Sequence, residues 1–309
     1  MSIAPSATAH SQRVQAMLLM HFCVLLWGFT AILGKVISIS ALNLVLWRVF
    51  LAGLCLYGYL WLRGQRMAAL DTRLQVKVFI SGALIGLHWV AFYASIKLAN
   101  ASIGVLCMCC APIFSALLTP IFERGAMRWG DFWIALAVLP GMLLVVGGVE
   151  PRFYLGIAVG VLAAFLVAAF GLMNKQLVQR VAVLPLCILQ MLSAGLLLLV
   201  PALLIGFTLP TSADWPVLIL FAVLCTAMPF VWAASALKYL SAFSAQFAIN
   251  LEPVYGILLA ALLLGETSEL SPQFYLGAAG ILLAVALQGF LQLKPRANKA
   301  PEAAALNPP

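Results

Sequence analysis

The sequence predicts an all-α membrane protein with ten transmembrane helices arranged as two inverted five-helix repeats. Three observations lead to this fold class: an apolar composition, ten apolar runs of helix length, and a pattern that recurs in the two halves. Of the 309 residues, 65% are hydrophobic and 8% are charged, and the mean hydropathy is +1.11. Soluble domains carry about 25% charged residues, so most of this surface is expected to face lipid.

Ten runs of roughly 20 apolar residues are bounded by charges, proline and glycine, and each is long enough to cross a ~30 Å hydrocarbon layer as a helix. Their approximate limits are residues 14–36, 42–62, 76–96, 102–122, 129–149, 153–173, 184–207, 215–237, 243–264 and 272–293. We expect residues 1–13 to form a cytoplasmic tail. Residues 294–309 are rich in Pro and Ala and are expected to form a disordered cytoplasmic tail.

The basic residues indicate the orientation of these spans, because cytoplasmic connections carry an excess of Lys and Arg. Of the 17 Lys and Arg residues, only Lys35, Lys97 and Arg152 fall on the side opposite to the termini, and Arg48 lies within a span. The pattern predicts a multi-pass protein of the plasma (inner) membrane with both termini in the cytoplasm. Topology and anionic lipid then explain the net charge of +8 without a nucleic acid partner.

An internal repeat relates the two halves of the chain. At one fixed offset, ASIKLANAS (94–102) aligns with SALKYLSAF (235–243), and the same offset pairs Pro112 with Pro253. The fourth and ninth spans therefore look like duplicates that cross the membrane in opposite directions. This predicts repeats over residues 14–149 and 153–293. Inverted repeats are typical of secondary transporters, in which the substrate binds near the midplane between the repeats.

Several segments, in this order on ten helices, resemble the EamA-like branch of the drug/metabolite transporter superfamily. They are WGFTAILGK (27–35), WRVF (47–50), LHWVAFYASIKLANAS (87–102), AP (111–112) and LEPVYGILLAALLLGE (251–266). The resemblance implies an exporter of amino acids, related metabolites or drugs. Similar members with a His-Trp pair in the third span include exporters of aromatic and other neutral amino acids. One departure is AAFGLMNK (168–175), which lacks the tryptophan that the first span has at Trp27.

Glu252 is the acidic residue expected near mid-membrane, about ten residues into the ninth span. A charge there costs at least ~2.5–3.5 kcal/mol, so we expect this carboxyl to be paired or protonated. It is thus either a proton carrier or substrate contact, or a structural and gating residue together with Pro253. Pro112, Pro229 and Pro253 are expected to supply deformable points in their spans.

Substrate contacts are expected in a cavity lined by the first, third, fourth, sixth, eighth and ninth spans. His88, Trp89 and Tyr93 share one side of the third span with Phe92, and an imidazole facing lipid would lack partners. We expect His88 to donate a hydrogen bond to a substrate carboxylate or carbonyl. Further candidates, each with helix packing as the alternative, are Trp27, Trp232, Asn250 and Tyr255.

Two basic residues are candidates for contact with a substrate carboxylate. Arg48 lies a short way into the second span, and Lys35 ends the first span. Either side chain could bind a carboxylate, or its aliphatic stem could snorkel to the interface or pair with another helix. Two pairs of glycines, Gly82 with Gly86 and Gly156 with Gly160, are expected to permit close helix packing.

The sequence contains no P-loop, no His-Glu-x-x-His, no Gly-x-Ser-x-Gly and no paired acidic motif for a diphosphate lipid. We therefore expect neither catalysis nor a cofactor. CMCC (107–110) is interpreted as packing rather than a metal site. The expected partners are a small-molecule substrate and the lipid bilayer. Transport driven by protons and by the substrate's own gradient both stay open, as do monomer and homodimer. The alternatives from other classes are an integral membrane enzyme acting on a lipid and a channel.

Overall fold

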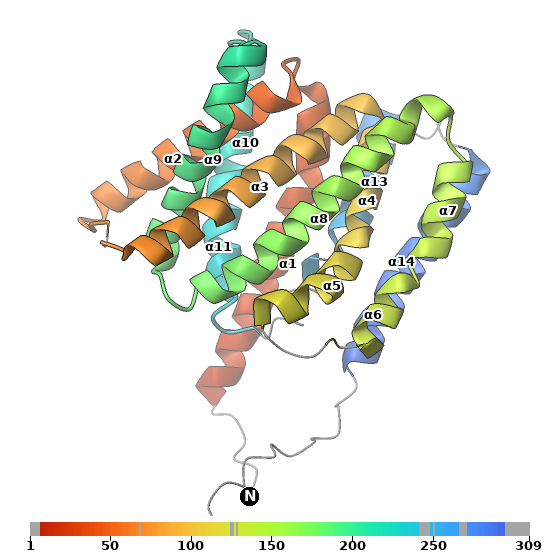
Figure 1. Cartoon of the computed structure of the whole chain (residues 1–309), viewed down its shortest axis with the longest axis horizontal. Helices are drawn as coiled ribbons and strands as arrows, with labels where there is room; N and C mark the ends of the chain where they lie inside the picture. Colours follow the sequence, from red (N-terminus) through yellow and green to blue (C-terminus); the bar gives the residue numbers. More distant parts are fainter. Residues whose placement is uncertain are drawn as a thin grey trace, which may run out of the picture.

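A computed structural model of the chain describes residues 7–67, 69–123, 127, 129–240, 248–249, 251–265 and 271–293. These residues form helices and their connections, with no strand among them. The helices lie side by side in one bundle (Figure 1). The predicted all-α class is therefore confirmed for the described residues.

Seven helical segments of this described part are long and apolar enough to cross a membrane. They are α1 (Ala7–Val36), α2 (Ala41–Leu62), α3 (Thr72–Leu98), α4 with α5 (Ala101–Cys107 and Ala111–Glu123), α8 (Tyr154–Leu177), α9 (Val183–Ile205), and α10 with α11 (Asp214–Ala222 and Met228–Ala236). Each overlaps one predicted run. Helix α3 begins before its apolar run because the Asp71 side chain caps it, accepting a hydrogen bond from the Leu74 amide at 2.8 Å.

Length and hydropathy give seven spans in the described residues against the ten predicted, and most of the remaining helices are shorter than their predicted runs. The predicted run 129–149 is divided into α6 (Trp129–Leu136) and α7 (Leu139–Gly147), next to Pro140, which has no amide hydrogen to donate. Helix α13 (Glu252–Leu264) covers only part of the run 243–264, of which residues 243–247 and 250 lie outside the described residues. Helix α14 (Pro272–Leu293) matches its predicted bounds.

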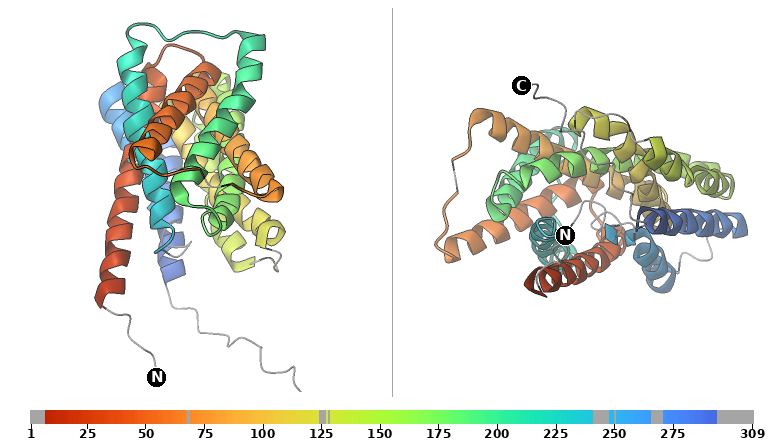
Figure 2. Two further views of the ribbon diagram at one scale, coloured as in Figure 1. Left: turned by 90° about the vertical axis from the view of Figure 1, so that its left-hand side faces the viewer. Right: turned by 90° about the horizontal axis from the view of Figure 1, so that it is seen from below.

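Helix α3 lies at the centre of one group, between α8 and α9, while α7 and α14 pair at one side of the bundle (Figure 1). Seen from below, α1 runs beside α11 and α13 (Figure 2). The expected glycine contacts are present. A Cβ atom on Gly82 would lie 2.6 Å from the Gln190 carbonyl oxygen of α9, and one on Gly156 would lie 2.7 Å from the Ala99 Cβ. Small residues therefore set how closely α3 approaches both neighbours.

Two spans contain a non-α turn just before a proline. Met108–Cys110 forms a 3₁₀ turn between α4 and α5, ahead of Pro112, and Val223–Ala227 forms a π-helical turn between α10 and α11, ahead of Pro229. Pro253 lies in the first turn of α13. Each proline thus sits at an interruption of regular α-helix, where fewer backbone hydrogen bonds resist bending.

Hydrogen bonds fasten the α1–α2 connection to the α9–α10 connection, which lie together at the top of the bundle in Figure 2. The Asp214 carboxylate accepts bonds from the Ser38 amide (2.8 Å) and hydroxyl (2.6 Å) and from the Thr211 hydroxyl (2.7 Å). The Asn43 side chain accepts from the Thr208 amide at 3.1 Å. We call this set of residues the clasp, and the end of the bundle that holds it the clasped end.

Substituting Gly156 with Ala should destabilise the protein, although alanine is the better helix former. The added Cβ would overlap Ala99 and lie 3.1 Å from its backbone nitrogen, and such overpacking costs about 1–3 kcal/mol. Gly171→Ala on the same helix is the control, because a Cβ there meets nothing within 4 Å; it should be neutral or stabilising by up to ~1 kcal/mol. Unfolding in detergent measures both. Equal effects of the two variants would contradict the packing assignment.

Candidate functional site

A cavity of about 410 Å³ lies between the helices of the bundle. Its walls come from α1, α3, the Met108–Cys110 turn with α5, α8, α11 and α13, which are the six spans that the sequence analysis expected, and Arg48 of α2 adds a seventh contribution. Arg48, Tyr93 and Thr226 mark one extremity of the cavity. The lining extends to Lys175 and Leu237 at the ends of α8 and α11, away from the clasped end, and Lys175 is exposed. The cavity is therefore accessible from the end opposite to the clasp.

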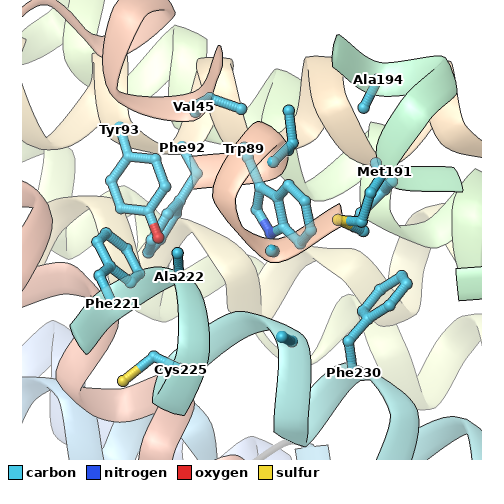
Figure 3. Packing of buried hydrophobic residues seen from close by; sticks show 14 of the residues in the cluster. Val45, Trp89, Phe92, Tyr93, Met191, Ala194, Phe221, Ala222, Cys225 and Phe230 are labelled. Atoms are coloured by element: carbon cyan, nitrogen blue, oxygen red, sulfur yellow. The ribbon is translucent and has the colours of Figure 1, made fainter. Parts of the chain in front are cut away.

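Arg48 is buried at the extremity nearest the clasp, with a side chain 1% exposed. Its Nε donates to the Thr226 hydroxyl at 2.5 Å, and its Nη1 donates to the Tyr93 hydroxyl at 2.8 Å. The guanidinium carbon lies 4.2 Å from the ring centroid of Trp89 and 4.4 Å from that of Phe221. Figure 3 shows these rings in the buried layer between α3 and α10. Hydrogen bonds and cation–π contacts offset part of the cost of burying the charge.

Arg48 is buried and bonds to groups of neighbouring helices instead of extending to the interface. The residue lies on the side of α2 that faces α3 and α10, so its stem points into the bundle instead of along the lipid surface. A guanidinium beside aromatic rings and hydroxyls finds partners that lipid does not provide. This places a positive charge inside the cavity wall.

Glu252 and Pro253 line the cavity from the first turn of α13. The Glu252 side chain is half-buried. Among the described residues it forms no hydrogen bond or ion pair, and the charge it interacts with is that of Arg48, at more than ion-pair distance. The sequence analysis allowed Glu252 a structural role in which its carboxyl pairs with another group. No such group is found among the described residues.

Helix α3 presents His88, Trp89, Phe92 and Tyr93 to the cavity, as expected, and α1 presents Trp27. The His88 Nδ1 lies 2.9 Å from the carbonyl oxygen of Ala163 on α8. Because a carbonyl only accepts, this nitrogen must carry the hydrogen. In the neutral ring Nε2 is then an acceptor, so the expected donation from His88 to a substrate carboxylate requires a second proton. His88 thus lines the cavity, and its hydrogen bond to a substrate stays a prediction.

Other sequence candidates are not brought to the cavity. Trp232 packs against Phe22, with ring centroids 6.0 Å apart, and Tyr255 packs against α1 at Gly28. Pro112 is buried outside the lining, and Lys35 is exposed at the end of α1. Asn250 lies outside the described residues. Helical periodicity identifies residues that share a face but does not say whether that face is turned to the cavity or to another helix.

The cavity also contains polar residues that the sequence analysis missed. They are Thr30, Ser115, Thr119, Asn174 and Thr226. Each is a polar residue inside an apolar span, and this signal could have identified them. Asn174 extends into a buried network, in which the Gln190 Nε2 donates to its Oδ1 at 3.0 Å and to the Ser81 hydroxyl at 2.8 Å. The lining is therefore amphipathic, with aromatic rings, hydroxyls and opposite charges.

Comparison with known proteins agrees with this architecture. The sequence model of the EamA-like transporter family matches residues 14–147 and residues 154–290. A solved structure described as "Crystal structure of protein" has a TM-score of 0.66 and 17% sequence identity, over 90% of this chain and 97% of that chain. This identity is informative about the fold alone. A comparison with curated proteins gives no significant match.

The two family matches divide the chain into successive segments and together cover most of it. The all-helical bundle, the apolar spans and the central cavity agree with a multi-pass membrane transporter of small solutes. The chain belongs to the EamA-like transporter family.

Proposed function

We propose that this protein is a secondary transporter that exports neutral or aromatic amino acids by alternating access. The observation that carries the proposal is that the Arg48 guanidinium and the Glu252 carboxyl line one cavity without pairing with each other. A zwitterionic amino acid has a carboxylate for the first group and an ammonium for the second. Each charged group of the substrate would thereby gain a protein partner in place of the water that it loses on entering the cavity.

The apolar part of the lining supports an aromatic or large neutral side chain. Trp27, Trp89, Phe92 and Phe230 contribute rings to the cavity, and Figure 3 shows three of these rings, those of Trp89, Phe92 and Phe230, in the buried cluster. Aromatic rings add about 0.5–1.5 kcal/mol per pair beyond the area that they bury. A volume of about 410 Å³ lies in the usual range of small-molecule sites.

The unequal ends of the bundle support alternating access. The clasp closes one end, and the cavity reaches exposed residues at the other. We propose ten spans in two inverted repeats, over residues 14–149 and 153–293, that rock about the cavity and bend at Pro112, Pro229 and Pro253. The distribution of basic residues supports an orientation with the clasped end outside the plasma membrane and the termini in the cytoplasm. The structure then corresponds to the state that loads substrate from the cytoplasm.

Counterflow in proteoliposomes tests the proposal directly. Vesicles preloaded with an unlabelled neutral or aromatic amino acid should take up the labelled compound with saturation, because exchange needs only the reorientation of a loaded carrier. Vesicles without protein are the control. Saturable exchange of other metabolites or cationic drugs, with no exchange of amino acids by folded protein, would contradict this substrate assignment and favour a multidrug or other-metabolite exporter.

Glu252→Gln should abolish the dependence of transport on a pH gradient, while downhill exchange continues at a higher half-saturating concentration because the substrate ammonium loses its charged partner. The amide keeps the shape of the carboxyl but cannot carry a proton. Glu150→Gln is the matched control, because Glu150 is exposed and its carboxylate bonds only to Arg152, at 3.0 Å, within the described residues. Initial rates with and without the gradient are compared. A gradient response that persists in Glu252→Gln would remove this residue as the proton carrier.

Trp89→Ala should raise the half-saturating concentration of an aromatic amino acid about tenfold or more, since burying a large apolar side chain is worth about 1.5–3 kcal/mol. His88→Ala should raise it as well. Trp232→Ala is the matched control and should leave it within about twofold, because Trp232 packs against Phe22 instead of lining the cavity. Competition assays on protein with an unchanged Tm give these values. An equal effect of the two tryptophan variants would refute the assignment of the cavity wall.

A further inference from the structure

We propose that Thr226 is a positioning residue that sets carboxylate selectivity by holding the Arg48 guanidinium in one orientation. The inference rests on the proposed function, because it takes the substrate to be an amino acid. Thr226 lies in the π-helical turn Val223–Ala227 and is 1% exposed. It touches the cavity beside Arg48, and its hydroxyl is the acceptor for Nε of that residue.

The direction of the hydrogen bond to Arg48 is fixed by a second bond of the same hydroxyl. The Thr226 hydroxyl donates to the Phe221 carbonyl oxygen at 3.0 Å, five residues back in the chain. A hydroxyl has one hydrogen, so its lone pairs remain free to accept from the Arg48 Nε at 2.5 Å. The neutral hydroxyl oxygen of Thr226 thus binds the guanidinium without neutralising its charge. The charge of Arg48 stays available for a ligand.

One turn of helix supplies both the ring and the acceptor that hold the guanidinium. The guanidinium carbon lies 4.4 Å from the ring centroid of Phe221 and 4.2 Å from that of Trp89. Extra residues in a helical turn are frequently found at functional sites. Here the π turn brings the hydroxyl of Thr226 next to the same guanidinium that Phe221 covers.

The remaining donors of Arg48 define what binds there. Of five N–H groups on a guanidinium, Nε is directed to Thr226 and one hydrogen of Nη1 to Tyr93. The other three have no partner among the described residues, and Arg48 lines the cavity. Two adjacent N–H groups in a plane match the two oxygens of a carboxylate. With Nε held by Thr226, the carboxylate must approach Nη1 and Nη2, which places the rest of the amino acid along the cavity.

The test compares L-phenylalanine with phenethylamine, which has the same ring and ammonium but no carboxylate. Both compounds compete for counterflow of labelled phenylalanine by wild-type protein and by Thr226→Val, which keeps the shape and loses the hydroxyl. We expect Thr226→Val to weaken competition by phenylalanine about tenfold and competition by phenethylamine less than twofold. Thr226→Ser, which restores the hydroxyl, should return phenylalanine to near its wild-type value.

A double-mutant comparison isolates the path through Arg48. If Thr226 acts by orienting this residue, Thr226→Val should have no further effect in an Arg48→Lys background, because an ammonium has no planar edge to orient. Equal weakening of both compounds by Thr226→Val, or failure of Thr226→Ser to rescue, would overturn the inference while leaving the proposed function intact. Wild-type protein that exchanges no amino acid would instead overturn the proposed function.

Discussion

The burial of one positive charge is the constraint on which the arrangement of the site depends. Arg48 is 1% exposed in a bundle whose other walls are mostly apolar, and an unpaired cation there would be strongly destabilising. Hydroxyls from α3 and the π turn and the rings of Trp89 and Phe221 beside the guanidinium offset this cost. Residues from three helices are thereby fixed at one point. The closed extremity of the cavity exists because these helices converge on that charge.

The sequence predicted the membrane environment of this protein better than the contacts between side chains inside the bundle. Composition and the ten apolar runs indicated a membrane protein, and the motifs around His88 and Glu252 indicated the family and two walls of the cavity. These predictions succeeded because a polar side chain in an apolar run is costly unless it faces other protein groups. The same rule applied to Thr226 and Asn174 would have added them to the site.

The errors have a different physical origin. Trp232 and Tyr255 belong to the right helices but pack against α1, because the rotation of a helix about its axis is decided by its neighbours. The burial of Arg48 likewise depends on rings from distant parts of the chain. The interruption of helix at the π turn adds a local change of register, which periodicity does not reveal. Such features depend on tertiary contacts that are not encoded in any one segment.

The clasp also has a thermodynamic consequence. Its bonds join the Asp214 carboxylate and the Asn43 amide to hydroxyl and backbone groups at one end of the bundle, where water can replace them. Each such bond contributes a net ~0.5–1.5 kcal/mol, and a change of about 1.4 kcal/mol alters an equilibrium constant tenfold. In the proposed alternating-access cycle, a few polar side chains far from the cavity would therefore set the balance between the clasped state and the opposite one. Within that proposed cycle, sequence changes at Ser38, Asn43 or Thr211 would shift this balance without altering any group that lines the cavity.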